Sequence, residues 1–169
     1  MKLKKPPIDE TLLLVHESGI SVAHILASHN KLPSNFSHWE LANKDGWSVA
    51  HEAAKHGFLP DDFYQWEIAD RFNWSVAHEA ARSKSLPRGF DRWAIKSNHS
   101  GKTVAHVAIC LGPLPVDFDQ WFLADDDRWT VAHEAAKRGF LPKNFNRWEL
   151  TDSLKRTVKD VYKHFNKHK

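Results

Sequence analysis

Apolar and polar positions recur in the same order along most of the chain, with a period of 27 residues. Val-Ala-His appears five times, at steps of 27, 27, 28 and 27 residues, and a degenerate sixth copy begins at Val158. Leu-Pro, Phe and Trp recur in the same phase. Self-similarity at a period of this length is typical of arrays of stacked repeats. The five copies begin at Val22, Val49, Val76, Val104 and Val131.

Each repeat is predicted to contain two short helices. A Ser or Thr precedes every Val-Ala-His, where its side chain can cap a helix, and good helix formers follow, as in residues 50–55. Glycines such as Gly57 suit the end of this first helix. Pro60 suits the first position of a second helix, on which Phe63 and Trp66 would share one face. Because isolated helices this short are marginal in water, stability is expected to come from stacking.

The stretch from Ser48 to Gly57, Ser-Val-Ala-His-Glu-Ala-Ala-Lys-His-Gly, resembles the Thr-Pro-Leu-His-x-Ala-Ala-x-x-Gly signature of the ankyrin repeat. Residues 43–46, Asn-Lys-Asp-Gly, resemble the turn that precedes this signature. The resemblance covers about residues 19–157 and implies an all-α, ankyrin-like solenoid of stacked helix-turn-helix repeats. The ankyrin unit is longer, at about 33 residues. We expect the missing residues to come from the β-hairpin between repeats, which would be shortened or absent.

The ends of the chain differ from the repeats and are expected to be caps. We divide the single repeat domain, residues 1–169, into an N-terminal cap (1–18), five repeats (19–154) and a C-terminal capping helix (155–169). Residues 8–18 are predicted to form the second helix of an incomplete first repeat. In the last helix Asp160 replaces the recurrent His and lysines fill the polar side, which gives the polar outer face that a terminal repeat needs.

Composition and charge narrow the possible functions. The chain is 41% hydrophobic and 27% charged, as globular proteins are, and no apolar run is long enough to span a membrane or form a signal peptide. Cys110 is the only cysteine, which favours a reducing, cytoplasmic location. The first five residues carry +3 and residues 155–169 carry +5, which leaves −5 on residues 6–154 of a chain whose net charge is +3. A body of this sign does not favour binding along a phosphate backbone.

No catalytic, metal or cofactor site is predicted, so the protein is not expected to be an enzyme. His51, Glu52 and His56 imitate a zinc-protease motif, but the two histidines are five residues apart rather than four. Residues 125–127, three aspartates, are interpreted as a solvated turn. The ankyrin resemblance implies that the recurrent histidines are hydrogen-bonding struts between repeats. These histidines are His24, His51, His78, His106 and His133.

Partner binding is predicted at positions that vary within the constant repeat. In ankyrin repeats the turn residues and the two residues after Ala-Ala commonly contact a partner along a concave face. We interpret the position before each cap as exposed, because Lys and Arg occur there beside Trp, and Trp and Arg are frequent interface hot spots. The alternative is that these Trp rings stack on one another and only rigidify the array. The predicted partner-binding residues are Lys44, Asp45, Trp47, Lys55, His56, Arg71, Phe72, Trp74, Arg82, His99, Lys102, Asp126, Asp127, Trp129, Lys137 and Arg138.

The expected function is non-catalytic binding of another protein, as an adaptor or inhibitor. A host-directed effector and a phage- or virus-encoded inhibitor both fit this expectation. The alternative is a nucleic-acid-associated protein that uses its basic termini and stacks bases on the Trp rings. Self-association through an exposed Trp surface is also left open.

Overall fold

The structure is a computed structural model and describes residues 10–98 and 100–167. The chain divides into two compact units, Met1–Pro87 and Arg88–Lys169. Among the described residues, no helix is both long and apolar enough to cross a membrane. Two predictions concern residues outside the described ranges. One is nucleic-acid association through the basic N-terminus, with Lys2, Lys4 and Lys5, and the other is partner binding by His99.

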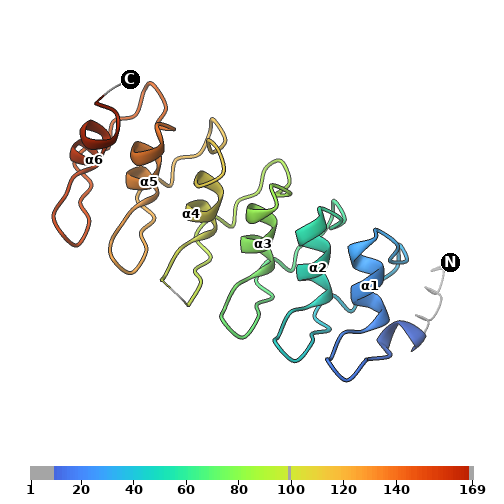
Figure 1. Ribbon diagram of the computed structural model, residues 1–169. Coiled ribbons are helices and arrows are strands. Elements are labelled where there is room, and N and C mark those ends of the chain that lie inside the picture. The colour runs from blue at the N-terminus through green and yellow to red at the C-terminus, as the bar shows by residue number, and fades with distance from the viewer. Residues whose placement is uncertain (1–9, 99, 168–169) are drawn as a thin grey trace. The chain divides into compact units, whose positions relative to one another are not determined.

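Both units are built from short α-helices that pack side by side, one helix in each repeat (Figure 1). The described residues contain no strand beyond isolated bridges, which confirms the predicted all-α class of repeat fold. The elements of unit 1 are the 3₁₀ helix η1 (Glu10–Leu13), α1 (Val22–Ser28), α2 (Val49–His56) and α3 (Val76–Arg82). The elements of unit 2 are α4 (Val104–Ile109), α5 (Val131–Arg138) and α6 (Val158–Phe165).

Helix ends follow the predicted capping residues. The Ser48 side chain accepts a hydrogen bond from the backbone N–H of His51 at 3.3 Å, and every other α-helix has the same Ser or Thr cap. Gly57 and Gly139 end α2 and α5 in the left-handed conformation, at φ of 73° and 77°. The one-residue insertion at 97–102 leaves the cap at Thr103 unchanged in geometry.

The prediction of a second helix in each repeat is wrong. After Pro60 the chain makes two separate turns. In the first, the N–H of Phe63 donates to the carbonyl of Pro60 at 3.0 Å, and in the second, the N–H of Ile68 donates to the carbonyl of Gln65 at 3.2 Å. The carbonyls of Trp66 and Ile68 then accept hydrogen bonds from the first N–H groups of α3. A helix start leaves these N–H groups without internal partners, and the turn conformation supplies acceptors for them.

The aromatic residues of these turns form the side of each unit's core. Phe63 and Trp66 are in contact, as their spacing predicts, with ring centroids 5.0 Å apart at 87°. Trp39 of the preceding repeat packs on Phe63 in the same edge-to-face manner, at 5.6 Å. In unit 2 the same alternation runs from Phe90 to Tyr162. Edge-to-face pairs place the positive ring edge on the negative ring face, so each repeat is attached to the next by aromatic contact.

The hairpin between repeats is shortened, as expected, to one antiparallel bridge. Ala42 pairs with Ser48, and Gly46 closes the turn between them at φ of +77°. A side chain at Gly46 would also lie 2.8 Å from the backbone nitrogen of Arg71 in the next turn, so glycine is required here on two counts.

The N-terminal cap is smaller than predicted. In place of a helix over residues 8–18, the described part contains only η1, whose Leu12 is buried in the unit 1 core with Ala23 and Phe36. Leu14 and Val15, which follow η1, are exposed. At the other end the last helix is α6, Val158–Phe165.

Candidate functional site

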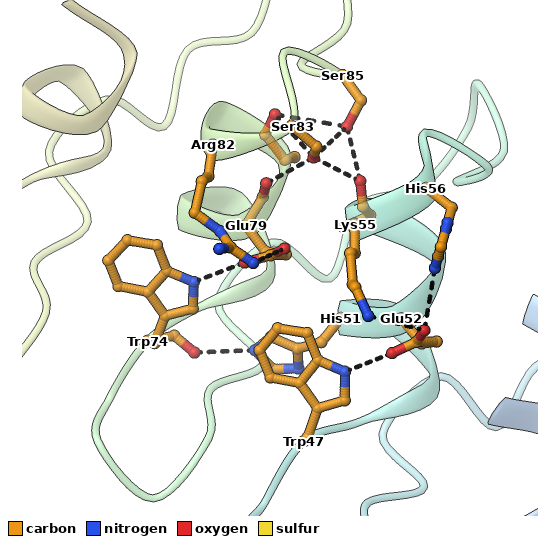
Figure 2. Close-up of polar contacts among 12 residues, drawn as sticks. Trp47, His51, Glu52, Lys55, His56, Trp74, Glu79, Arg82, Ser83 and Ser85 are labelled. Carbon is orange, nitrogen blue, oxygen red and sulfur yellow. Dashed lines mark hydrogen bonds and ion pairs between the residues drawn. The ribbon is translucent and has the colours of Figure 1, made fainter. Parts of the chain in front are cut away.

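The recurrent histidines join each helix cap to the following repeat. In α2 the His51 Nδ1 atom lies 2.7 Å from the Ser48 hydroxyl and accepts the backbone N–H of Ser48 at 3.2 Å. The Nε2 atom lies 2.8 Å from the carbonyl oxygen of Trp74, 23 residues further on (Figure 2). His24, His106 and His133 make the same three contacts. The prediction of hydrogen-bonding struts is therefore confirmed for these four residues, which we call the histidine network.

The contacts of the histidine network fix the protonation state of each ring. Nδ1 faces a backbone N–H donor and Nε2 faces a carbonyl acceptor, so the ring is neutral and carries its proton on Nε2. Burial lowers the pKa of His51, His106 and His133 below the ordinary value of 6.5. For His51 the Trp74 carbonyl and the carboxylates of Asp70 and Glu79 oppose this pKa shift without cancelling it. With both nitrogens occupied, these rings are unsuited to bind a metal or act as a catalytic base.

A second set of contacts surrounds Glu52, which the sequence analysis considers only as part of an imitation of a zinc-protease motif. Glu52 accepts a hydrogen bond from the indole N–H of Trp47 at 2.9 Å (Figure 2). Its other carboxylate oxygen lies 3.1 Å from His56 Nε2 and 3.4 Å from Lys55 Nζ. Trp47, Lys55 and His56 were all predicted as partner-binding residues, so the structure brings three predicted residues together around one carboxylate.

The same arrangement recurs around Glu79. Trp74 donates its indole N–H to Glu79 at 3.1 Å, and Arg82 binds both carboxylate oxygens, at 2.9 and 2.7 Å (Figure 2). The Glu79 side chain is buried. Two-pronged binding by arginine and an indole donor compensates the burial of this charge.

The third copy surrounds Glu134 in unit 2. Trp129 donates its indole N–H to Glu134 at 3.1 Å, and Arg138 donates to the carboxylate at 2.6 Å. The Cys110 thiol of the preceding repeat lies 3.5 Å from the same carboxylate. We call these three groups the Trp–Glu clusters, comprising Trp47, Glu52, Lys55 and His56; Trp74, Glu79 and Arg82; and Trp129, Glu134 and Arg138.

Hydrogen bonding keeps two of these carboxylates ionised. Burial raises the pKa of Glu134, but the hydrogen bonds from Arg138 and Trp129 outweigh it, and the net pKa lies below its ordinary value. For Glu52 burial also raises the pKa, and the contacts with Trp47, Lys55 and His56 outweigh it in the same way. In these two clusters the carboxylate is therefore an anion that accepts hydrogen bonds from an indole N–H and from a cationic side chain, Lys55 or Arg138.

The tryptophans are less exposed than the sequence interpretation expected. Trp47, Trp74 and Trp129 are each half-buried, whereas Lys102 at the equivalent position is exposed. The rings of Trp47 and Trp129 lie tilted on His51 and His133 of the histidine network, with the Trp47 and His51 centroids 4.8 Å apart at 32°. The Trp74 ring lies in the same way on His78, with centroids 4.9 Å apart at 33°. One face of each tryptophan ring thus packs against a histidine within its own repeat and is not available to a partner.

The remaining predicted residues lie on exposed turns and helix ends. Arg71 forms an ion pair with Asp45 at 2.8 Å, and its guanidinium lies 4.7 Å from the ring centroid of the exposed Phe72. Lys137 Nζ lies 5.7 Å from the ring centroid of Phe165. Lys44, Lys102, Asp126 and Asp127 are also exposed.

The fourth repeat interrupts the pattern and opens a groove. Lys102 stands in place of Trp, Val107 in place of Glu, and Cys110 in place of the cation. A groove of about 550 Å³ lies at this point, lined by Lys102, Cys110, Trp129 and Glu134 among others. Burial raises the pKa of the Cys110 thiol, so the groove does not hold an activated nucleophile.

The aspartate-rich turn has an internal use. The Asp125 side chain accepts the backbone N–H groups of Asp127 and Trp129, at 3.1 and 2.8 Å. Across residues 10–98 and 100–167, no three His, Cys, Asp or Glu side chains lie close enough together to hold a metal ion. The turn is thus stabilised by its own backbone donors.

Comparison with known proteins supports the fold. No protein-family model matches the chain, and no curated protein matches it. Among solved structures, the ankyrin repeat domain of Bcl-3, a member of the IkappaB family, is similar, with a TM-score of 0.64 and 16% identity over 89% of this chain and 81% of that one. A chain of the complex between the predatory endopeptidase Bd0816 of Bdellovibrio bacteriovorus and the immunity protein Bd3460 is also similar, with a TM-score of 0.62 and 14% identity over 91% and 94% of the two chains. The fold is that of an ankyrin-like repeat array.

Proposed function

We propose that this protein is a non-catalytic module that binds a partner protein and acts as an adaptor or inhibitor. The observation that carries the proposal is the division of each repeat into two parts. The histidine network repeats without change, whereas the residues beside it alternate between Trp–Glu clusters and the groove at the fourth repeat. Variation beside a constant histidine scaffold supports a recognition role for the varying residues of each unit.

The chemistry of this surface supports a protein partner. Each Trp–Glu cluster combines an indole ring with Arg, Lys or His, and Trp and Arg are over-represented among residues that dominate binding energy. Exposed Phe72 adds apolar area beside Arg71. Each indole N–H is directed at a carboxylate, and such anions disfavour a nucleic-acid backbone at the same place.

An inhibitory role is supported by analogy alone. One of the similar structures is a complex that contains an endopeptidase and an immunity protein. For this chain, occupation of a partner's surface is the mechanism that we propose. The use of both histidine nitrogens within the fold favours binding over catalysis, and the single, half-buried Cys110 favours a reducing, cytoplasmic location.

The test uses two phenylalanines in matched surroundings. Phe72 and Phe122 are each 52% exposed, and each has an arginine guanidinium over its ring, Arg71 at 4.7 Å and Arg147 at 5.8 Å. Phe72 belongs to the turn that precedes Trp74 of a Trp–Glu cluster, whereas Phe122 directly follows Trp121 of the aromatic turns that form the side of the core. Proteins captured by the wild type from untreated and nuclease-treated portions of a cell lysate are identified, and their affinities for the wild type, Phe72→Ala and Phe122→Ala are measured by calorimetry.

We expect Phe72→Ala to weaken binding by about tenfold or more and Phe122→Ala to leave it unchanged. Circular dichroism establishes that both variants are folded. Equal affinity of the two variants for the captured protein contradicts the proposed surface. Capture that disappears on nuclease treatment favours the nucleic-acid alternative.

A further inference from the structure

The aromatic turns of the first two repeats form a groove that the proposed function does not use. The groove has a volume of about 480 Å³ and lies in unit 1, between the turns that follow α1 and α2. None of its lining residues belongs to a hairpin turn or a Trp–Glu cluster. We call it the turn groove, and its principal side chains are those of Phe36, Trp39, Pro60, Asp62, Phe63 and Tyr64.

The aromatic lining of the turn groove is already ordered. The ring centroids of Phe36 and Trp39 are 5.1 Å apart, and those of Trp39 and Phe63 are 5.6 Å apart, both in edge-to-face contact. Phe36 and Phe63 are buried, whereas Trp39 is half-buried. Because this packing holds the rings in place, little side-chain freedom is lost when a ligand binds.

Tyr64 lines the turn groove and departs from the repeat pattern. The other four repeats have a polar residue at this position, which is Ser37, Asp91, Asp119 or Asn146. Tyr64 is 78% exposed and has no hydrogen bond or ring contact with any other described residue. The repeat therefore does not require an aromatic ring here, and an exposed aromatic side chain beside a groove indicates a binding surface.

The same turn carries two carboxylates. Asp61 and Asp62 are exposed, and no other repeat has two acidic residues at these positions. Asp62 is the only charged residue among the described residues that line the turn groove. The groove thus has a negative charge that a basic ligand would complement.

The donors of the turn groove indicate which kind of segment fits. The Trp39 indole N–H and the Tyr64 hydroxyl donate to no other group in the part of the chain that the structure describes. A helical ligand satisfies its own carbonyls and would leave both donors unused. Addition of a strand needs a sheet edge, and the described residues contain only isolated bridges.

A polyproline II helix meets both requirements of the turn groove. It has no internal hydrogen bonds, so its carbonyls are available to the two donors. Its proline rings pack on aromatic side chains, and grooves lined by such side chains are the ordinary sites of its recognition. The helix is also formed before it binds, which lowers the entropy lost on binding.

We propose that the turn groove binds a proline-rich segment of another protein, in the polyproline II conformation and with a basic residue beside the prolines. The prolines pack on Trp39 and Tyr64, which donate to the carbonyls of the segment. The basic residue lies at Asp61 and Asp62. This inference does not depend on the partner proposed for the Trp–Glu clusters, because the clusters and the turn groove share no residue.

The test is calorimetry of the full chain with a synthetic peptide of eight prolines that has an arginine at each end. We expect saturable binding at peptide concentrations up to about 1 mM. One control peptide has alternating glycine and serine in place of the prolines and is expected not to bind. The other has glutamine in place of the arginines and is expected to bind about two- to fivefold more weakly, as the loss of an exposed ion pair predicts.

A pair of variants locates the binding site. Tyr64→Ser introduces the residue that the first repeat carries at this position, and we expect it to bind the arginine peptide about tenfold or more weakly. The control is Phe122→Ser, which removes an exposed aromatic ring in unit 2 and is expected to bind as the wild type does. Should Tyr64→Ser lose its helical signal by circular dichroism, Asp62→Asn provides the test, through loss of the preference for arginine over glutamine.

The proposal is overturned if the wild type does not bind the arginine peptide or binds the glycine–serine peptide equally well. Equal affinity of Tyr64→Ser and the wild type also overturns it. Residues 4–7 of the chain itself, Lys-Lys-Pro-Pro, have the composition of the proposed ligand. The double variant Pro6→Ser and Pro7→Ser is expected to bind the peptide as the wild type does. Tighter binding by this variant shows that the chain competes for its own groove, and it overturns the assignment to another protein.

Discussion

Helices α4 and α5 are neighbours in unit 2 with the same internal contacts and different surroundings. Thr103 caps α4 and Thr130 caps α5, and His106 and His133 bind these caps with nearly equal distances. Around this common core, α5 has Trp129, Glu134 and Arg138, whereas α4 has Lys102, Val107 and the Cys110 thiol.

The comparison shows that the histidine network and the Trp–Glu clusters are separable. The α4 repeat folds with the same cap and the same histidine geometry although it lacks a cluster. The tryptophan and the glutamate five residues later are present together in three repeats and absent together in the others. The histidine network therefore stabilises the repeat, whereas the repeat folds with or without a Trp–Glu cluster.

The largest expected effect comes from removing one histidine of the histidine network. His133→Ala leaves the Thr130 N–H and the Arg156 carbonyl without partners and opens a cavity. We expect a loss of about 2–4 kcal/mol in the free energy of unfolding, measured by urea denaturation. His164→Ala, at an exposed position of α6, is the control and is expected to have little effect. Equal stability of the two variants would show that the network is dispensable.

A change of pH weakens the same network without a substitution. Since the pKa of His51, His106 and His133 is lowered in the folded state, the unfolded chain binds more protons below its ordinary pKa of 6.5. Stability is therefore complete above this pH and falls as pH decreases toward the folded-state values, by at most about 1.4 kcal/mol per pH unit for each ring.

This pH dependence is measured by urea denaturation between about pH 7.5 and about pH 5.5, where carboxylates remain ionised. Constant stability across this window would contradict the neutral state assigned to the rings. Loss of stability confined to lower pH would assign the effect to carboxylates instead.

A smaller effect is expected when the missing cluster is built into α4. Lys102→Trp and Val107→Glu together provide the indole donor and the carboxylate that α5 has. We expect the double variant to be more stable than the sum of the single variants predicts, by about 0.5–1.5 kcal/mol. Thermal denaturation of the wild type, both single variants and the double variant gives this coupling energy. A coupling of zero would mean that the cluster needs more of its surroundings than these two residues.

An effect of the same size is expected from removing one hydrogen bond of α5. Trp129→Phe keeps an aromatic ring on His133 but removes the indole N–H that Glu134 accepts. The expected loss in the free energy of unfolding is about 0.5–1.5 kcal/mol, because Arg138 still binds the carboxylate. A loss as large as that of His133→Ala would show that the clusters belong to the stabilising core after all.

Much of the fold could be predicted because it depends on contacts within one repeat. The Ser or Thr cap, the His three residues later and Gly57 are local signals, and each acts as its residue type predicts. The glutamates could also have been found, since they vary together with tryptophans five residues earlier. The sequence analysis considers Glu52 only as part of an imitated zinc-protease motif and does not single out Glu79 and Glu134.

The second helix could not be judged from its sequence. Pro60, Phe63 and Trp66 have the spacing of a helix, and their side chains do meet as that spacing predicts. The backbone instead forms turns, because its carbonyl groups satisfy the first N–H groups of the following helix. Local helix propensity does not include the hydrogen bonds that these carbonyl groups accept from another helix.

By itself the sequence determined the 27-residue period, which is read directly from the recurring residues, and the helix caps, which follow from short-range hydrogen bonding within a repeat. The structural use of the histidines was implied by the resemblance to ankyrin repeats. The tertiary structure decided which groups each repeat offers to its neighbours. It placed one face of the Trp47 ring against His51 and directed the indole N–H of Trp47 at Glu52. It also left Val22 exposed where its equivalents are buried, because burial depends on what is stacked on a residue and not on the residue itself.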